Sequence, residues 1–126
     1  MKMRTAILGC GAMGTVLGAY LNKNGHDTIL IDNYKDHVKA LNKKGARVIG
    51  CGDLTVPVKA ITPDLMEGKY DLVFLLTKQT ANKEVLSHLL PFLKADSTVC
   101  TLQNGVPEPS VASIIGKEKT VGGTVL

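Results

Sequence analysis

Short apolar runs alternate along the chain with segments whose apolar residues recur at helical spacing. The apolar runs predict five strands, at residues 5–8, 28–32, 72–77, 98–102 and 120–125. The intervening segments predict helices at residues 12–24, 34–44, 81–93 and 108–114. Continuous apolar strands that alternate with helices are typical of a parallel sheet buried on both faces. We therefore expect the α/β class, a Rossmann-type doubly wound parallel sheet with helices on both faces, as one domain over residues 1–126.

One segment departs from this alternation. Residues 46–60 contain two short β-type stretches around the turn Gly52-Asp53. This pattern predicts a hairpin or an irregular extension before the sheet resumes.

The turn after the first strand carries the spacing Gly9-x-Gly11-x-x-Gly14 and leads into a helix. In a dinucleotide-binding turn the first glycine permits the tight bend, the second lets the pyrophosphate approach the backbone, and the third lets helix and strand pack closely. The helix N-terminus then holds the phosphates through its unpaired N–H groups. The residues expected to contact the pyrophosphate are Gly9, Cys10, Gly11, Ala12, Met13 and Gly14.

An acid stands at the end of the second predicted strand, where a ribose-binding carboxylate belongs. Asp32, followed by Asn33, would accept hydrogen bonds from the adenosine ribose and repel a 2′-phosphate, so the sequence favours NAD. The row Lys35, Lys39 and Lys43 leaves a second interpretation open. These lysines would attract the 2′-phosphate of NADP, or they form a solvated helix face.

Charge and composition narrow the classes of partner. The formal charge is +4 and the isoelectric point near 9.0, but the lysines are scattered and aromatic residues make up 4% of the chain, so nucleic acid is not expected. Cys10, Cys51 and Cys100 show no metal-binding spacing and are expected to be reduced thiols. No apolar run approaches the roughly 20 residues that span a bilayer, so we expect no membrane association and a cytoplasmic location.

Two further strand ends carry polar side chains. Thr77, Lys78 and Gln79 follow the third strand, and Gln103-Asn104-Gly105 follows the fourth. Ligands of open α/β sheets bind beyond the carboxyl ends of the strands. Lys78 would supply a cation for the cofactor, and the amides would serve a carbonyl group.

These motifs together resemble the amino-terminal domain of the ketopantoate reductases, also called 2-dehydropantoate 2-reductases. The resemblance rests on a set of short motifs: the run 7–14, Gly25-His26 before the second strand, Lys78 after a strand that ends in Thr77, Asn104-Gly105, and the run 121–124. It implies hydride transfer from a nicotinamide cofactor to the ketone of a small 2-keto acid, ketopantoate, on the route to pantothenate and coenzyme A. It also implies that Thr77, Lys78 and Gln79 contact the cofactor and that Asn104 lies near both the nicotinamide and the substrate.

The sequence departs from the family pattern in two ways. Many members carry an arginine after the second strand to hold the phosphate of NADP, whereas this chain has Asp32-Asn33. The resemblance also places the proton-donating lysine and a substrate-binding acid in a helical carboxy-terminal domain, beyond Leu126. The chain is therefore expected to be the cofactor-binding half of the enzyme, without a catalytic acid or metal site of its own. The helical domain is its expected partner, and a homo-oligomer is compatible with the sequence.

The three histidines, His26, His37 and His88, do not follow strands at the ligand edge, so we expect surface or packing roles for them. Two alternative functions remain at this point. One is a dinucleotide-sensing regulatory domain, which needs adenosine contacts but has little use for Lys78 and Asn104. The other is the cofactor domain of a related 2-keto acid or sugar or glycerol phosphate dehydrogenase.

Overall fold

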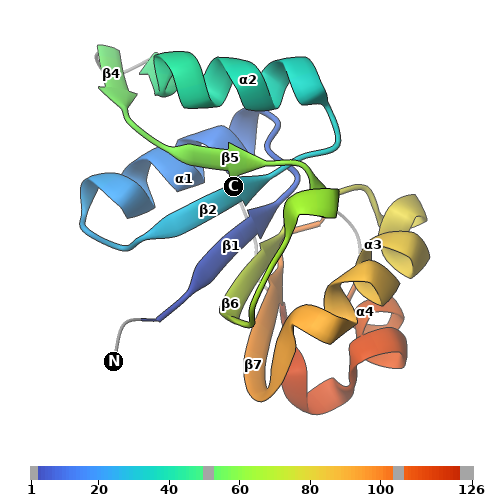
Figure 1. Cartoon of the computed structure of the whole chain (residues 1–126). Helices are drawn as coiled ribbons and strands as arrows, with labels where there is room; N and C mark the ends of the chain where they lie inside the picture. Colours follow the sequence, from blue (N-terminus) through green and yellow to red (C-terminus); the bar gives the residue numbers. More distant parts are fainter. Residues whose placement is uncertain (1–2, 50–52, 104–106, 123–126) are drawn as a thin grey trace.

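Six parallel strands form the main sheet of the computed structural model, which describes residues 3–49, 53–103 and 107–122 (Figure 1). Their spatial order is β5-β2-β1-β6-β7-β8. The strands are β1 (Thr5–Leu8), β2 (Thr28–Ile31), β5 (Lys59–Ile61), β6 (Tyr70–Leu75), β7 (Leu93–Thr101) and β8 (Thr120–Gly122). The helices are α1 (Ala12–Lys23), α2 (Lys35–Lys44), α3 (Asn82–Leu89) and α4 (Glu108–Ile115). The expected Rossmann-type α/β fold is confirmed.

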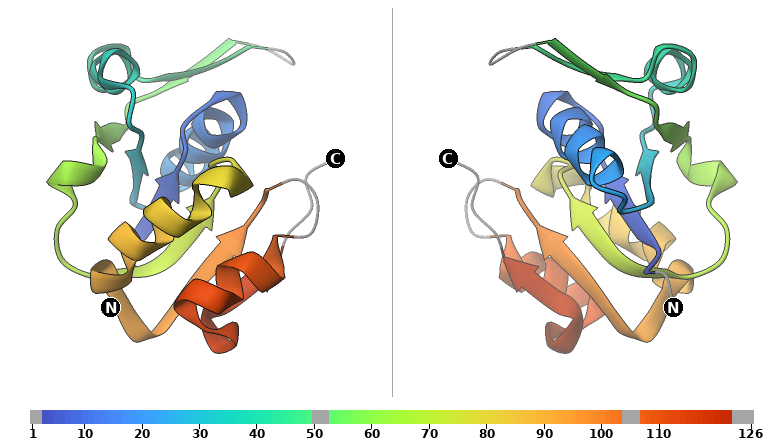
Figure 2. Two further views of the ribbon diagram at one scale, coloured as in Figure 1. Left: turned by 90° about the vertical axis from the view of Figure 1, so that its right-hand side faces the viewer. Right: turned by 90° about the vertical axis from the view of Figure 1, so that its left-hand side faces the viewer.

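The helices cover opposite faces of the sheet (Figure 2). On one face, Ile7 and Leu30 pack with apolar residues of α1 and α2. On the other face, Val73, Leu75 and Val99 pack with α3 and α4. Alternate residues of the central strands β2, β1 and β6 thus enter two separate cores, which explains why these strands read as continuous apolar runs.

The strand order reverses beside β1. The chain runs outward from β1 through β2 to β5, then returns to β6 on the other side of β1. The crevice at such a reversal, outside the carboxyl ends of the strands, is the usual ligand site of open α/β sheets. The glycine-rich turn after β1 lies at this point.

The segment 46–60 was only partly predicted. β3 (Ala46–Ile49) and β4 (Asp53–Val56) form the expected antiparallel hairpin, in a sheet of their own. The prediction was wrong for the last residues of this segment, because they belong to β5, a separate strand that pairs in parallel with β2. Pro57 lies between β4 and β5 and ends the hairpin pairing, since a proline has no N–H to continue the ladder.

Several predicted boundaries shift. β6 begins at Tyr70 and ends at Leu75, and β7 begins at Leu93. The helix predicted for residues 81–93 is split into α3 and the flanking 3₁₀ turns η2 (Gln79–Ala81) and η3 (Leu90–Phe92). Pro91 explains the second break, because its ring clashes with the preceding helical turn. The end of the last predicted strand, residues 123–125, lies outside the described residues.

Two asparagines connect helices to strands through the same pair of hydrogen bonds. Asn42 of α2 donates its amide N–H to the Ala60 carbonyl at 2.8 Å and accepts the Ala60 N–H at 2.8 Å. Asn22 of α1 makes the equivalent pair with the backbone of Thr28, at 3.1 Å in each direction. Each side-chain amide therefore makes the two hydrogen bonds that a neighbouring strand would make. It satisfies backbone groups of the strand that the helix backbone cannot reach.

Replacing Asn42 by alanine should destabilise the protein. Ala60 is buried, so its N–H and carbonyl groups would lose their partner and cost about 1–3 kcal/mol in the free energy of unfolding. Urea unfolding followed by circular dichroism measures this difference, and Lys39→Ala on the exposed face of α2 is the matched control. Equal stability of the two variants would show that water replaces the asparagine at this edge.

Candidate functional site

The glycine-rich turn joins β1 to α1 through two steric contacts that only glycine permits. Gly9 has φ +94°, and a Cβ there would lie 2.8 Å from the Thr77 backbone nitrogen. A Cβ on Gly14 would overlap the Gly9 carbonyl oxygen. Gly11 differs, because a Cβ there would meet no atom of the described residues within 4 Å. The second glycine therefore leaves open space at the start of α1, whereas the other two allow the chain to pack.

The start of α1 presents backbone donors to this space. Gly11 precedes the helix, and its carbonyl accepts the first helical hydrogen bond, from Thr15 N–H at 2.9 Å. The N–H groups of a first helical turn have no partner within the helix. The side chains of Ala12 and Met13 are exposed here, so the backbone donors lie at the surface, where the sequence analysis expected an anion.

Cys10 is held at each of its polar atoms. Its N–H donates to Asp32 Oδ2 at 3.0 Å, and its thiol lies 3.5 Å from the Ile31 carbonyl. Its carbonyl accepts from Thr15 Oγ1 at 3.1 Å and from His37 Nε2 at 2.5 Å. Burial, with the neighbouring Asp32 charge, raises the pKa of the Cys10 thiol to about 12, so the sulfur is neutral and acts as a packing group.

Asp32 anchors two loops at the end of β2. Besides the Cys10 N–H, it accepts the Tyr34 N–H at 3.0 Å through Oδ1, where the chain turns into α2. Each carboxylate oxygen can accept a second hydrogen bond. The acid predicted to bind ribose therefore also holds the glycine-rich turn beside the start of α2.

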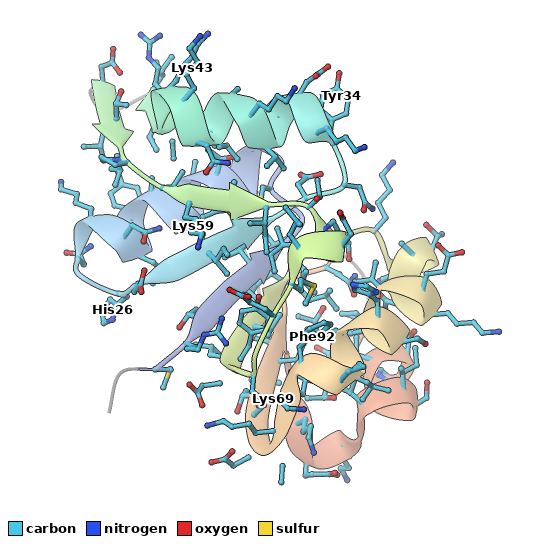
Figure 3. All side chains as sticks on the ribbon, viewed as in Figure 1. His26, Tyr34, Lys43, Lys59, Lys69 and Phe92 are labelled. Carbon is cyan, nitrogen blue, oxygen red and sulfur yellow. The ribbon has the colours of Figure 1, made fainter. Side chains whose placement is uncertain are left out.

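The residues that follow Asp32 lie at the surface. Asn33 and Tyr34 are exposed, and Figure 3 shows Tyr34 and Lys43 at opposite ends of α2. Lys35, at the first position of α2, is the member of the lysine row nearest to Asp32 in the sequence. Lys39 and Lys43 continue along exposed positions of the helix, away from its start.

The turn after β6 meets the glycine-rich turn. Thr77 touches Gly9, and its hydroxyl oxygen is buried without a hydrogen-bond partner among the described residues. A buried, unpaired hydroxyl costs free energy unless a further group completes it. Lys78 is exposed beside it, and Gln79 begins η2.

Below this edge lies a buried polar cluster that the sequence analysis did not identify. Gln103 and Asn82 exchange amide hydrogen bonds, at 2.7 Å and 3.2 Å, and Gln103 also donates to the Thr77 carbonyl at 2.6 Å. Thr101 and Ser110 contact the same pair. The available signal was the place of Gln103 two residues after β7, where its amide was expected to serve a carbonyl group of the ligand; it is instead buried and bonded within this cluster. The neighbouring Asn104, predicted to bind cofactor and substrate, lies outside the described residues.

A cavity of about 210 Å³ opens next to this edge, between the end of β2 and α3. Asn33 lines it at the Asp32 side, and Val85 and His88 line it from α3. Its walls contain both polar and apolar groups, and Leu8 and Met66 are among the apolar ones.

The histidines take three different positions. Figure 3 shows His26 at the turn between α1 and β2, remote from the start of α2. His88 contacts the Pro63 carbonyl at 2.9 Å. His37 is half-buried on the Cys10 carbonyl, a link to the glycine-rich turn that its helical position did not reveal.

Within the described residues, no group of three or more His, Cys, Asp or Glu side chains is placed to hold a metal ion. In the same residues, no helix has the length and apolar character needed to cross a membrane.

Comparisons with known proteins place the chain in a family. The sequence model described as "Ketopantoate reductase PanE/ApbA" matches residues 5–126. A 2-dehydropantoate 2-reductase of Pyrococcus abyssi is 38% identical over 96% of this chain and 39% of its own length. One of Lactococcus lactis is 31% identical over 98% of this chain and 41% of its own length. The chain thus spans about two fifths of the curated relatives it matches.

Solved structures give the same result. A 2-dehydropantoate 2-reductase from Geobacter metallireducens superposes with a TM-score of 0.82, at 32% identity over 95% of this chain and 40% of that one. D-mandelate dehydrogenase, in a ternary structure with NADH and anilino(oxo)acetate, superposes with a TM-score of 0.87, at 25% identity over 97% and 40%. On the match over residues 5–126, the chain belongs to the ketopantoate reductase family, PanE/ApbA, and corresponds to its amino-terminal domain.

Proposed function

We propose that this chain is the dinucleotide-binding half of a 2-keto acid reductase, with ketopantoate as the substrate and NADH as the favoured cofactor. The observation that carries the proposal is the glycine-rich turn. Gly11 leaves open space at a helix N-terminus, and the same turn is flanked by the Asp32 carboxylate and by the Thr77 hydroxyl, which has no hydrogen-bond partner in the described part of the chain. These groups fit the phosphates and ribose of a dinucleotide.

Each part of the edge has a role in this proposal. The amides of Gly11, Ala12 and Met13 hold the pyrophosphate, and the second lone pairs of Asp32 accept the ribose hydroxyls. The cavity beside Asn33 offers apolar walls to the adenine. Lys78, Gln79 and the Thr77 hydroxyl serve the remaining polar groups of the cofactor.

When bound, the nicotinamide supplies the hydride. Ketone reduction also needs a proton donor within hydrogen-bond reach of the substrate oxygen. We assign that donor, and the second wall of the substrate site, to a polypeptide equivalent to the three fifths of the relatives' length that this chain does not match. In this chain Asn104 would orient the carbonyl. A cytoplasmic location, where the thiols stay reduced, belongs to the same proposal.

A 2-keto acid other than ketopantoate is a second candidate for the substrate. It is favoured by the likeness to D-mandelate dehydrogenase. The structure of that enzyme contains NADH, which is also the cofactor that Asp32 favours in this chain. Both candidates use the same cofactor half.

The chain should bind NADH, and Gly11→Val should abolish binding without unfolding the protein. Gly11 has φ −68°, which valine accepts, and its Cβ position is open, so the new side chain would fill only the space of the pyrophosphate. Isothermal titration calorimetry measures binding, circular dichroism checks folding, and Ala95→Val on exposed β7 is the control. A folded chain that binds neither NADH nor NADPH at millimolar concentration would refute the cofactor assignment.

NADH should bind more tightly than NADPH. The Asp32 carboxylate would face a 2′-phosphate at a cost of about 1–3 kcal/mol, or roughly 5- to 150-fold in Kd. Asp32→Ala should reduce this ratio, although it also removes the anchor of the Cys10 N–H and weakens both ligands. Lys35→Ala is the control and should leave the ratio unchanged. Equal or tighter NADPH binding by the unaltered chain would instead assign the phosphate to the α2 lysines.

The chain alone should not reduce ketopantoate at an enzyme-like rate, even with NADH bound. Positioning of the ketone and acid catalysis each contribute several orders of magnitude to such a rate, and the acid and the second wall that completes the positioning are assigned to other polypeptide. Loss of NADH absorbance in the presence of ketopantoate measures the rate. Robust turnover would place the acid within this chain, with Lys78→Met the first variant to examine.

A further inference from the structure

We propose that His37 and Thr15 orient the Gly11 amide toward the pyrophosphate, which makes His37 a positioning residue for dinucleotide binding. This inference rests on the proposed function. It concerns how the glycine-rich turn is held before the cofactor arrives.

The Cys10 carbonyl receives two side-chain donors from two helices. Thr15 Oγ1 of α1 lies at 3.1 Å and His37 Nε2 of α2 at 2.5 Å. A carbonyl oxygen can only accept, so Nε2 of His37 carries a proton in this contact. His37 is half-buried on α2, and its ring reaches the glycine-rich turn through this contact.

This contact determines the direction of the next N–H group. A trans peptide is planar, and its carbonyl and N–H point in opposite directions. Because His37 and Thr15 hold the Cys10 carbonyl, the Gly11 N–H must point away from both of them. As far as the structure describes the chain, the space at Gly11 is open, with no atom within 4 Å of its Cβ position.

The turn needs such a clamp because Cys10 stands between two glycines. Gly9 and Gly11 lack the Cβ that restricts the backbone elsewhere, so their own side chains do little to fix the two peptide planes next to Cys10. Asp32 fixes the plane before Cys10 through its N–H, at 3.0 Å. His37 and Thr15 fix the plane after it. The cofactor then meets an amide that is already oriented, which reduces the ordering cost of binding.

The test is calorimetric titration of NADH into a matched set of variants. His37→Leu removes the donor and should weaken NADH binding about threefold to tenfold, the range of one hydrogen bond. His37→Gln carries an N–H at comparable reach and should restore most of the affinity. Thr15→Val should weaken binding similarly, and Thr15→Ser should not. His26→Leu, at the remote turn, is the control.

A second readout separates positioning from general stability. In ¹⁵N-labelled protein, the Gly11 amide resonance of the cofactor-free chain should shift in His37→Leu and return toward its original position in His37→Gln. Circular dichroism melts identify any variant that is not folded. If His37→Leu does not fold, the Thr15 pair tests the same carbonyl.

The outcomes distinguish the two proposals. If the unaltered chain does not bind NADH, the proposed function fails. If the unaltered chain binds NADH and folded His37→Leu and Thr15→Val bind it equally well, the positioning role fails while the proposed function stands. A loss in His37→Leu that glutamine does not reduce also overturns the hydrogen-bond role.

Discussion

The close packing of α1 against β1 is the constraint on which the rest of the structure depends. It exists because Gly14 has no side chain and its Cα can lie against the Gly9 carbonyl. Further along the helix, a Cβ on Gly18 would lie 2.8 Å from a Leu30 methyl carbon, so the same close packing continues onto β2. The helix axis, and with it the direction of the first-turn N–H groups, follows from these two contacts.

Around this contact the protein uses polar side chains as rigid connections between elements. Asp32 joins β2 to the glycine-rich turn, Asn22 and Asn42 join helices to strands, and the Asn82–Gln103 pair joins α3 to the end of β7. In each case a short side chain satisfies buried backbone or amide groups. The carboxyl edge of the sheet is therefore held by directional bonds as well as by apolar packing.

The sequence predicted the parts of the fold that depend on local pattern. The strands apolar on both faces, the glycine-rich turn between the first strand and the first helix, and the acid directly after the second strand each have a local physical cause, and these elements lie in the predicted order although several strand boundaries differ. β5 was missed because only three residues pair with β2, and they follow closely after the two short strands of the hairpin. The role of His37 was missed because its contact with Cys10 spans 27 positions and depends on how α2 crosses the turn. Such contacts have no signature in spacing.

The Asn42 side chain has a consequence for association between molecules. β5 lies at the edge of the main sheet, and an edge strand with open N–H and carbonyl groups is a template for strand addition and aggregation. Asn42 occupies both backbone groups of Ala60 at that edge. An incoming strand would have to displace these two bonds before it could pair there. A single helical amide thus protects this side of the sheet from unwanted self-assembly.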